Sequence, residues 1–228
     1  MSSYKKHAIF ALILTLPFFP NVFSLALAVI GASFPDFDHR LKMKNISLLF
    51  IIGSITTLLF YIFKLPYLLG IILITLAIIF YLSEHRGFTH SLLGIFLLSI
   101  ILTVLVVSSY YFFFFDLGLK QQGTLAVILI ILGSLTINRN IILPFIFIGV
   151  LGVLLTPFPG LDLYKVLGAF LLGFISHVIL DSFTPSGVEF LRPFYKKRFK
   201  KGFGILFIVL WLLGASYYII NFGFNVIR

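Results

Sequence analysis

The sequence has no cysteine and few charged residues. Only 11% of its 228 residues are charged and seven are acidic, whereas 61% are hydrophobic and the mean hydropathy is +1.16. Soluble domains are about half apolar and about a quarter charged, so this chain has too little polar surface to cover a globule in water. A soluble enzyme and a disordered chain are therefore both excluded. Without thiolates, disulfides are excluded too, and any metal ion must take nitrogen and oxygen ligands.

Apolar runs fill most of the chain, and proline, glycine and short polar stretches separate them. The runs cover residues 8–16, 22–34, 46–63, 68–82, 92–115, 124–137, 141–155, 163–180 and 205–222. A helix needs about 20 mostly apolar residues to cross a bilayer, so the shorter runs must be tilted, re-entrant or shielded by neighbouring helices. Pro17 and Pro20 favour two short helices in a hairpin over one long first helix.

These runs predict an all-α integral membrane protein. We expect a polytopic helical bundle with an N-terminal short-helix hairpin and about seven further transmembrane segments. We expect residues 1–228 to form a single membrane domain.

The ionisable residues are concentrated in three short strings. Four of the five histidines and four of the seven acids lie in residues 35–40 (Pro-Asp-Phe-Asp-His-Arg), 84–91 (Glu-His-Arg-Gly-Phe-Thr-His-Ser) and 177–181 (His-Val-Ile-Leu-Asp). Each string follows or precedes an apolar run, and an even number of crossings separates them. The three strings are therefore expected on the same side of the membrane, within motif regions 7–40, 83–91 and 176–193. The N-terminal hairpin would return His7 to that side, beside Asp36.

The distribution of basic residues predicts the orientation. Of the 17 lysines and arginines, 13 fall on the side of the three strings. The positive-inside rule then makes this side cytoplasmic, which predicts a multi-pass protein of the inner membrane. The net charge of +10 indicates anionic lipid headgroups as partners. Nucleic acid is a weaker reading, because no soluble basic domain is present to bind it.

The basic juxtamembrane loop at residues 192–204 has two readings. It can simply bind anionic headgroups, or it can draw an anionic substrate toward the strings.

His177 and Asp181 are four residues apart, so they project from one face of a helix. An imidazole and a carboxylate are costly in a membrane helix unless they have partners. A structural hydrogen bond between the two is the simpler explanation for the pair taken alone. The two further strings expected on the same side favour a shared site instead.

The other strings also have simpler readings. Asp36 and Asp38 repel each other unless a cation lies between them, but they could form an ordinary turn that caps a helix. His85 and His90 flank Gly87, which indicates a loop that folds both inward or an interfacial loop. His7 alone would be a solvated histidine beside two lysines.

Taken together, the candidate metal ligands are imidazoles and carboxylates. They are His7, Asp36, Asp38, His39, His85, His90, His177 and Asp181. This mixture suits zinc best, with manganese or iron possible, better than a site for magnesium or calcium. The set exceeds what one tetrahedral ion needs, so either several ions bind or some residues orient the others.

Three further residues are candidates for chemistry and substrate binding. Arg86 could hold a phosphate through its guanidinium group, and Glu84 is a candidate general base. Thr184 lies in a tight turn with Pro185 and Gly187, which directs the chain back to the site and makes Thr184 a candidate substrate contact.

The three strings, with residues 182–188 (Ser-Phe-Thr-Pro-Ser-Gly-Val), closely resemble the signature of the YdjM-like family of inner-membrane proteins. Members are described as membrane-bound metal-dependent hydrolases, and some are labelled LexA-binding. The resemblance extends from His7 to about Pro193, and it implies that His7 belongs to the ligand set. Glu84 departs from the family pattern, which has a glycine at this position, and this counts against an acid–base role.

A more remote similarity connects His177 and Asp181 with the His-x3-Asp pair of zinc-dependent phospholipase C and related nucleases. It favours phosphoester substrates. The leading hypothesis is a membrane-embedded metal-dependent hydrolase that cleaves a phosphoester of a lipid or lipid-linked substrate at the cytoplasmic face through a metal-activated water. The alternatives are a non-enzymatic membrane anchor or regulator, and a transporter that uses the His/Asp cluster as an ion relay.

Overall fold

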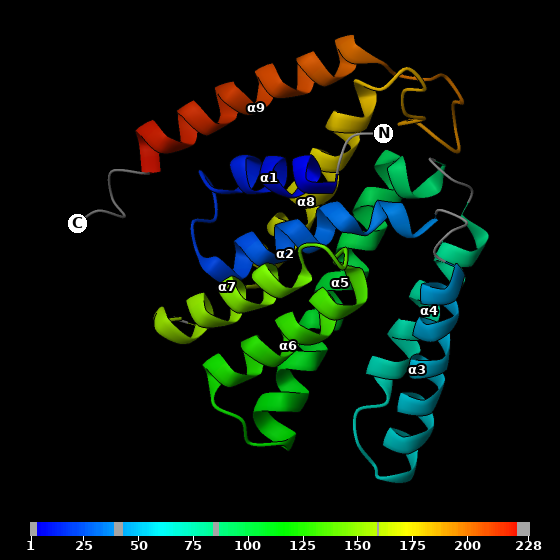
Figure 1. Cartoon of the computed structure of the whole chain (residues 1–228), viewed down its shortest axis with the longest axis vertical. Helices are drawn as coiled ribbons and strands as arrows, with labels where there is room; N and C mark the ends of the chain where they lie inside the picture. Colours follow the sequence, from blue (N-terminus) through cyan, green and yellow to red (C-terminus); the bar gives the residue numbers. More distant parts are fainter. Residues whose placement is uncertain (1–3, 39–42, 84–86, 159, 223–228) are drawn as a thin grey trace.

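The chain folds into α-helices, most of them joined by short connections, with a longer connection at residues 183–200 between α8 and α9 (Figure 1). The structure is a computed structural model that describes residues 4–38, 43–83, 87–158 and 160–222. Its α-helices over these ranges are α1 (Tyr4–Thr15), α2 (Val22–Ser33), α3 (Met43–Ile62), α4 (Leu68–Leu82), α5 (Leu92–Tyr111), α6 (Gln121–Thr136), α7 (Ile142–Leu155), α8 (Leu163–Ser182) and α9 (Lys201–Phe222). Short turns of other helix types are η1 (Pro35–Asp38), η3 (Phe88–His90) and η4 (Phe112–Asp116). Within the described ranges no β-strand forms, and one isolated antiparallel bridge joins Val188 to Phe199. The all-α prediction is confirmed.

Four helices are long and apolar enough to cross a membrane. They are α3, α5 together with η4, α8 and α9, with 20 to 25 residues each, and a helix of 20 residues spans about 30 Å, which matches the hydrocarbon core. The other apolar helices α2, α4, α6 and α7 have 12 to 16 residues. The expected count of about seven transmembrane segments after the hairpin is therefore not confirmed, because helix length supports four spans in the described part of the chain.

The predicted N-terminal hairpin is present. Helix α1 ends at Thr15, before Pro17 and Pro20, and α2 begins after Asn21, whose side chain accepts a hydrogen bond from the Ser24 N–H at 2.8 Å. Proline cannot donate a backbone hydrogen bond, so the two prolines suit a break between helices. Helix α1 then packs against both α2 and α8, and this brings its first turn back toward the end of α2.

Small residues allow α2 and α8 to pack closely. Gly173 of α8 lies directly against the backbone of Ala28, and a Cβ added at Gly31 of α2 would lie 3.0 Å from the carbonyl oxygen of Phe170. Such contacts between small residues let helix backbones approach without large side chains between them. Gly173 is also four residues before His177, so this close contact directs His177 toward the end of α2.

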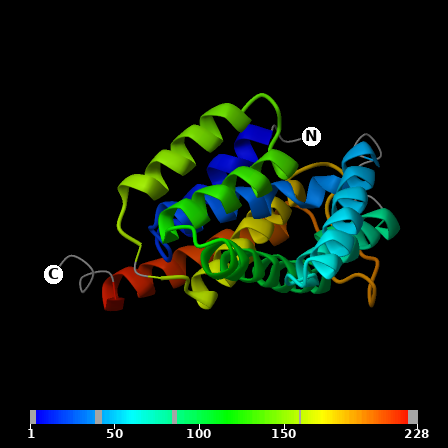
Figure 2. The same ribbon diagram turned by 90° about the horizontal axis from the view of Figure 1, so that it is seen from below.

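Helices α3 and α4 form a hairpin beside the rest of the bundle (Figures 1 and 2). Gly53 and Gly70 lie at their contact, where a Cβ on Gly53 would come within 2.9 Å of the Ile74 nitrogen. The hairpin reaches the bundle chiefly through α4 against α5, and both of its helices also touch η1. It therefore contacts the bundle only along part of its length.

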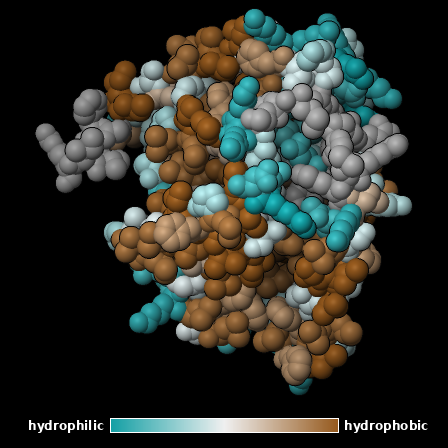
Figure 3. All heavy atoms as spheres, viewed as in Figure 1, coloured by the Kyte–Doolittle hydropathy of each residue, from teal (hydrophilic) through white to brown (hydrophobic). Residues whose placement is uncertain are grey.

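Helix α9 is the least buried of the candidate spans, with 11% of its most apolar window inside the structure. It runs above α1 in Figure 1, and the indole N–H of Trp211 donates to the Leu14 carbonyl at 3.0 Å. Figure 3 shows apolar side chains over most of the visible face, and hydrophilic side chains gathered at the upper right, where the connection from α8 leads to the start of α9. The apolar exterior fits a protein surrounded by lipid.

Candidate metal centre

Five of the predicted ligands meet where four helices begin or end. His7 lies in the first turn of α1, Asp36 in η1 directly after α2, His90 in η3 directly before α5, and His177 and Asp181 in the last two turns of α8. Residues up to 174 positions apart in the sequence are thus brought together. The predicted convergence of the three strings and of His7 is confirmed for these five residues.

The Asp181 carboxylate lies at the middle of the cluster. Its Oδ1 atom is 3.7 Å from His7 Nε2, and its Oδ2 atom is 3.5 Å from His90 Nε2 and 3.8 Å from His177 Nε2. Asp36 Oδ1 also lies 3.8 Å from His177 Nε2. The imidazole rings of His7 and His177 stack with centroids 4.2 Å apart, and the His90 ring meets that of His177 edge-on at 5.1 Å.

The cluster is shielded from solvent except at Asp36. The side chains of His177 and Asp181 are 1% and 8% exposed, whereas that of Asp36 is 31% exposed. A buried carboxylate without a compensating partner is costly. Asp36 has the most exposed side chain of the five residues.

Backbone and hydroxyl groups fix the histidine orientations. His177 Nδ1 lies 2.7 Å from the Ala32 carbonyl oxygen, so Nδ1–H donates to it and the lone pair of Nε2 faces the carboxylates. His90 Nδ1 lies 3.0 Å from the Thr89 hydroxyl. Among the described residues, His177 Nε2 and His7 Nδ1 are buried nitrogens with no hydrogen-bond partner.

Burial favours the neutral form of the His7 imidazole. Helix α1, which carries His7, has 12 residues and a length of about 18 Å. It is too short to cross the bilayer, so His7 does not lie within a membrane-spanning helix. Burial, and then the neighbouring His177, lowers the pKa of His7 from 6.5 to about 4. A neutral imidazole has a free ring lone pair, which is the form that binds a metal ion.

The donor atoms fit a metal ion better than direct hydrogen bonds. The nitrogen–oxygen distances of 3.5 to 3.8 Å exceed hydrogen-bonding range. Two ligands that each lie about 2.0–2.2 Å from one tetrahedral ion are about 3.3–3.6 Å apart. His7, His177 and Asp181 are all buried, and each offers a donor atom within 4.8 Å of the other two. This group of three could hold a metal ion.

The remaining predicted site residues are less fully described. His39, Glu84, His85 and Arg86 lie outside the described residues, and Asp38 is described only as the last backbone position of η1. Their proposed roles stay predictions. Thr184 is described: its hydroxyl donates to the Asp181 carbonyl at 2.7 Å, and its backbone N–H donates to the same oxygen at 3.0 Å. Thr184 therefore closes the end of α8 next to the cluster, and its contact with a substrate remains untested.

Sequence reasoning missed the groups that support the ligands. The Tyr4 hydroxyl pairs with that of Ser33, and Asp36 lies close enough to Tyr4 to act on it electrostatically. Tyr4 and His7 are three residues apart on one helical face, which is a signal that could have linked them. The Ala32 carbonyl has no such signal, because a backbone oxygen carries no residue identity.

Fold and site together define a class: an all-helical membrane protein that buries a His/Asp cluster where four helices begin or end. The family model of the YdjM inner membrane protein matches residues 4–227, and the chain belongs to this family. No curated protein and no solved structure matches the chain.

Proposed function

We propose that this protein is a membrane-embedded metal-dependent hydrolase that cleaves a phosphoester of a lipid or lipid-linked substrate at the cytoplasmic face of the inner membrane. The observation that supports it is the buried group of His7, His177 and Asp181, whose donor atoms lie within 4.8 Å of one another. Three protein ligands that leave a position open are typical of catalytic metal sites.

A divalent ion, with zinc the best match to imidazole and carboxylate donors, would polarise a phosphoryl oxygen and acidify a water molecule there. His7, His177 and Asp181 would hold this ion, with His90 and Asp36 completing or supporting the set. The Ala32 carbonyl and the Thr89 hydroxyl keep the imidazoles of His177 and His90 in place. Burial excludes bulk water from the ligands, while half-buried Asp36 leaves one side for the substrate.

Three residues are proposed to act on the substrate. Arg86 is four residues before His90 in the sequence, and its guanidinium is proposed to bind the phosphate. Glu84 remains a candidate base that departs from the family pattern. Thr184 is the proposed third contact, because its turn lies against Asp181.

Elemental analysis of detergent-purified protein tests this proposal directly. We expect stoichiometric transition metal in the wild type and its loss in Asp181→Ala. Asp162→Ala is the matched control, because Asp162 caps the other end of α8 and accepts from the Tyr164 N–H at 2.9 Å; it should keep the metal. Wild-type protein that contains no stoichiometric metal would rule the proposal out.

A substrate screen should follow with phospholipids and isoprenoid phosphates. We expect phosphate-ester cleavage that disappears in Asp181→Ala and persists in Asp162→Ala. Cleavage that is equal in both variants would show that another part of the preparation is responsible.

A further inference from the structure

A cavity of about 490 Å³ lies between the α3–α4 hairpin and helices α5 and α6. Seven of its fifteen lining residues are leucines: Leu48 and Leu49 of α3, Leu73 and Leu76 of α4, Leu105 of α5, and Leu132 and Leu135 of α6. Ligand sites of proteins are commonly about 300–1,000 Å³. Helix α3 packs chiefly on α4, so the hairpin lines one side of the cavity and α5 and α6 line the other.

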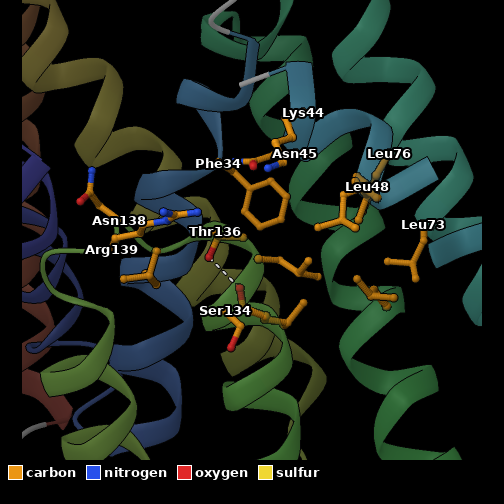
Figure 4. A pocket seen from close by; sticks show the side chains of 15 residues that line it. Phe34, Lys44, Asn45, Leu48, Leu73, Leu76, Ser134, Thr136, Asn138 and Arg139 are labelled. Atoms are coloured by element: carbon orange, nitrogen blue, oxygen red, sulfur yellow. Dashed lines mark hydrogen bonds between the residues drawn. The ribbon is translucent and has the colours of Figure 1, made fainter. Parts of the chain in front are cut away.

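One end of this cavity is cationic. Lys44 and Asn45 come from the first turn of α3, and Asn138 and Arg139 come from the connection between α6 and α7. Figure 4 shows Lys44, Asn45 and Arg139 around the ring of Phe34, with Leu48, Leu73 and Leu76 along the hairpin side. None of the described residues that line the cavity is acidic. Lys44 and Arg139 are exposed, and no described lining residue is a carboxylate that would neutralise them, so this end of the cavity is electrostatically complementary to an anionic group.

The other end of the cavity is apolar and continues further. A second cavity of about 430 Å³ shares Leu73, Leu105, Leu132, Ser134 and Leu135 with the first. Its wall adds Phe60 of α3, Leu69 of α4 and Ile128 of α6, and no charged residue is among its described lining. The combined space is therefore charged at one end and apolar along the rest of its length. A lipid has the same arrangement, with a charged headgroup at one end and an apolar hydrocarbon chain.

The cationic end also adjoins the metal centre. Phe34 lies in the cavity wall, and Asp36, two residues later, faces His177 at 3.8 Å. Tyr4 links the two regions, because its hydroxyl pairs with Ser33 and also lies against the backbone of Asn138. A group held between Lys44 and Arg139 is thus next to the half-buried side of the His/Asp cluster.

We propose that this cavity binds a membrane lipid whose phosphate headgroup carries a net negative charge: the phosphate lies between Lys44 and Arg139, and one hydrocarbon chain occupies the leucine-lined space between the hairpin and α5–α6. Arginine and lysine are the usual phosphate partners, and the apolar walls remove the chain from the surrounding bilayer. The binding of this lipid is independent of catalysis. Its identification as the substrate class rests on the function proposed above.

Lipid binding to delipidated protein in detergent tests this, with native mass spectrometry as the readout. The probes are phosphatidic acid, phosphatidylcholine and glycerol 3-phosphate. We expect wild-type protein to bind phosphatidic acid in preference to the other two, because phosphatidylcholine lacks net negative charge and glycerol 3-phosphate lacks the chain. Equal binding of phosphatidylcholine, or glycerol 3-phosphate binding as tight as that of phosphatidic acid, would overturn the proposal.

A charge-reversed variant locates the headgroup. Lys44→Glu with Arg139→Glu should weaken phosphatidic acid binding by about tenfold or more. Lys64→Glu with Lys120→Glu makes the same change in net charge at exposed lysines that line neither cavity, and it should bind like the wild type. Equal affinity of the two double variants would overturn the assignment of Lys44 and Arg139.

A cavity-filling variant tests where the hydrocarbon chain of the lipid binds, even if the charge reversal disturbs folding. Leu73→Trp places a large side chain where the two cavities join, and it should reduce phosphatidic acid binding by about tenfold. Ile71→Trp on the same helix is the control, since Ile71 is 41% exposed and lines neither cavity. If Leu73→Trp binds phosphatidic acid as well as the wild type does, the hydrocarbon chain of the lipid lies elsewhere.

Metal content separates this proposal from the function proposed above. Asp181→Ala should lose the metal and still bind phosphatidic acid, whereas the charge-reversed variant should lose the lipid and keep the metal. Metal-free wild-type protein that binds the lipid as expected would overturn the hydrolase and leave the lipid site standing.

Discussion

The Nδ1 atom of His177 lies 2.7 Å from the carbonyl oxygen of Ala32, across the contact between α8 and α2. This hydrogen bond joins the residue that faces both carboxylates, Asp36 and Asp181, to the last turn of the helix that precedes Asp36. The geometry of the candidate metal centre thus depends on how closely α2 and α8 pack.

Widening the α2–α8 contact should therefore disrupt the metal centre. Gly173→Val places a branched side chain against the Ala28 backbone, and such overpacking costs about 1–3 kcal/mol of stability. We expect a lower thermal midpoint and a loss of bound metal, measured by thermal unfolding in detergent and by elemental analysis. Gly214→Ala on α9 is the control, because a Cβ there meets no described atom within 4 Å. Full metal content in Gly173→Val would contradict the dependence on this contact.

The hydroxyl of Thr89 should affect metal affinity without contributing to the stability of the fold. Thr89→Val keeps the shape of the side chain and removes the oxygen that lies 3.0 Å from His90 Nδ1. Loss of a group that orients a ligand typically lowers metal affinity about 10- to 100-fold, and a competition titration with a chelator would measure this.

Thr103→Val provides the comparison for Thr89→Val. In the wild type, the buried Thr103 hydroxyl donates to the Ser99 carbonyl within α5, away from the cluster. An equal change in metal affinity in both variants would show that the effect of Thr89 is not specific to His90.

Removal of the metal by a chelator should destabilise the wild-type protein and leave the stability of Asp181→Ala unchanged. A ligand at about 100 times its dissociation constant stabilises a folded protein by about 2.7 kcal/mol, so a chelator should lower the thermal midpoint of the wild type. Asp181→Ala already lacks the central carboxylate, and its midpoint should be the same with and without chelator. A chelator-induced shift of the same size in Asp181→Ala would place the stabilising ion at another site.

The contact between α9 and α1 should affect stability and leave the site unchanged. Trp211→Phe removes the indole N–H that donates to the Leu14 carbonyl, and the loss of one such hydrogen bond costs about 0.5–1.5 kcal/mol. We expect a small fall in the thermal midpoint with full metal content. A loss of metal in this variant would indicate that α9 supports the cluster through α1.

Much of the fold could be predicted because helix signals are local. The apolar runs, and the breaks at Pro17 and Pro20, define the positions of the helices to within a few residues. The number of spans could not be predicted in the same way, since α4 and α6 are as apolar as longer helices but have only 15 and 16 residues. Membrane crossing depends on length and on neighbouring helices, and hydropathy alone does not settle it.

The sequence by itself determined that this is an all-helical membrane protein, and it determined which residues could bind a metal, because apolar run length and the clustering of histidines and acids are properties of the chain. Only the tertiary structure decided that the Asp181 carboxylate lies at the middle of the His/Asp cluster, that Ala32 orients His177, and that Lys44 and Arg139 share one cavity with a leucine wall. These relationships depend on the distances between helices. Small residues such as Gly173 set how closely helices approach, and a single small residue leaves no periodic signal in the sequence.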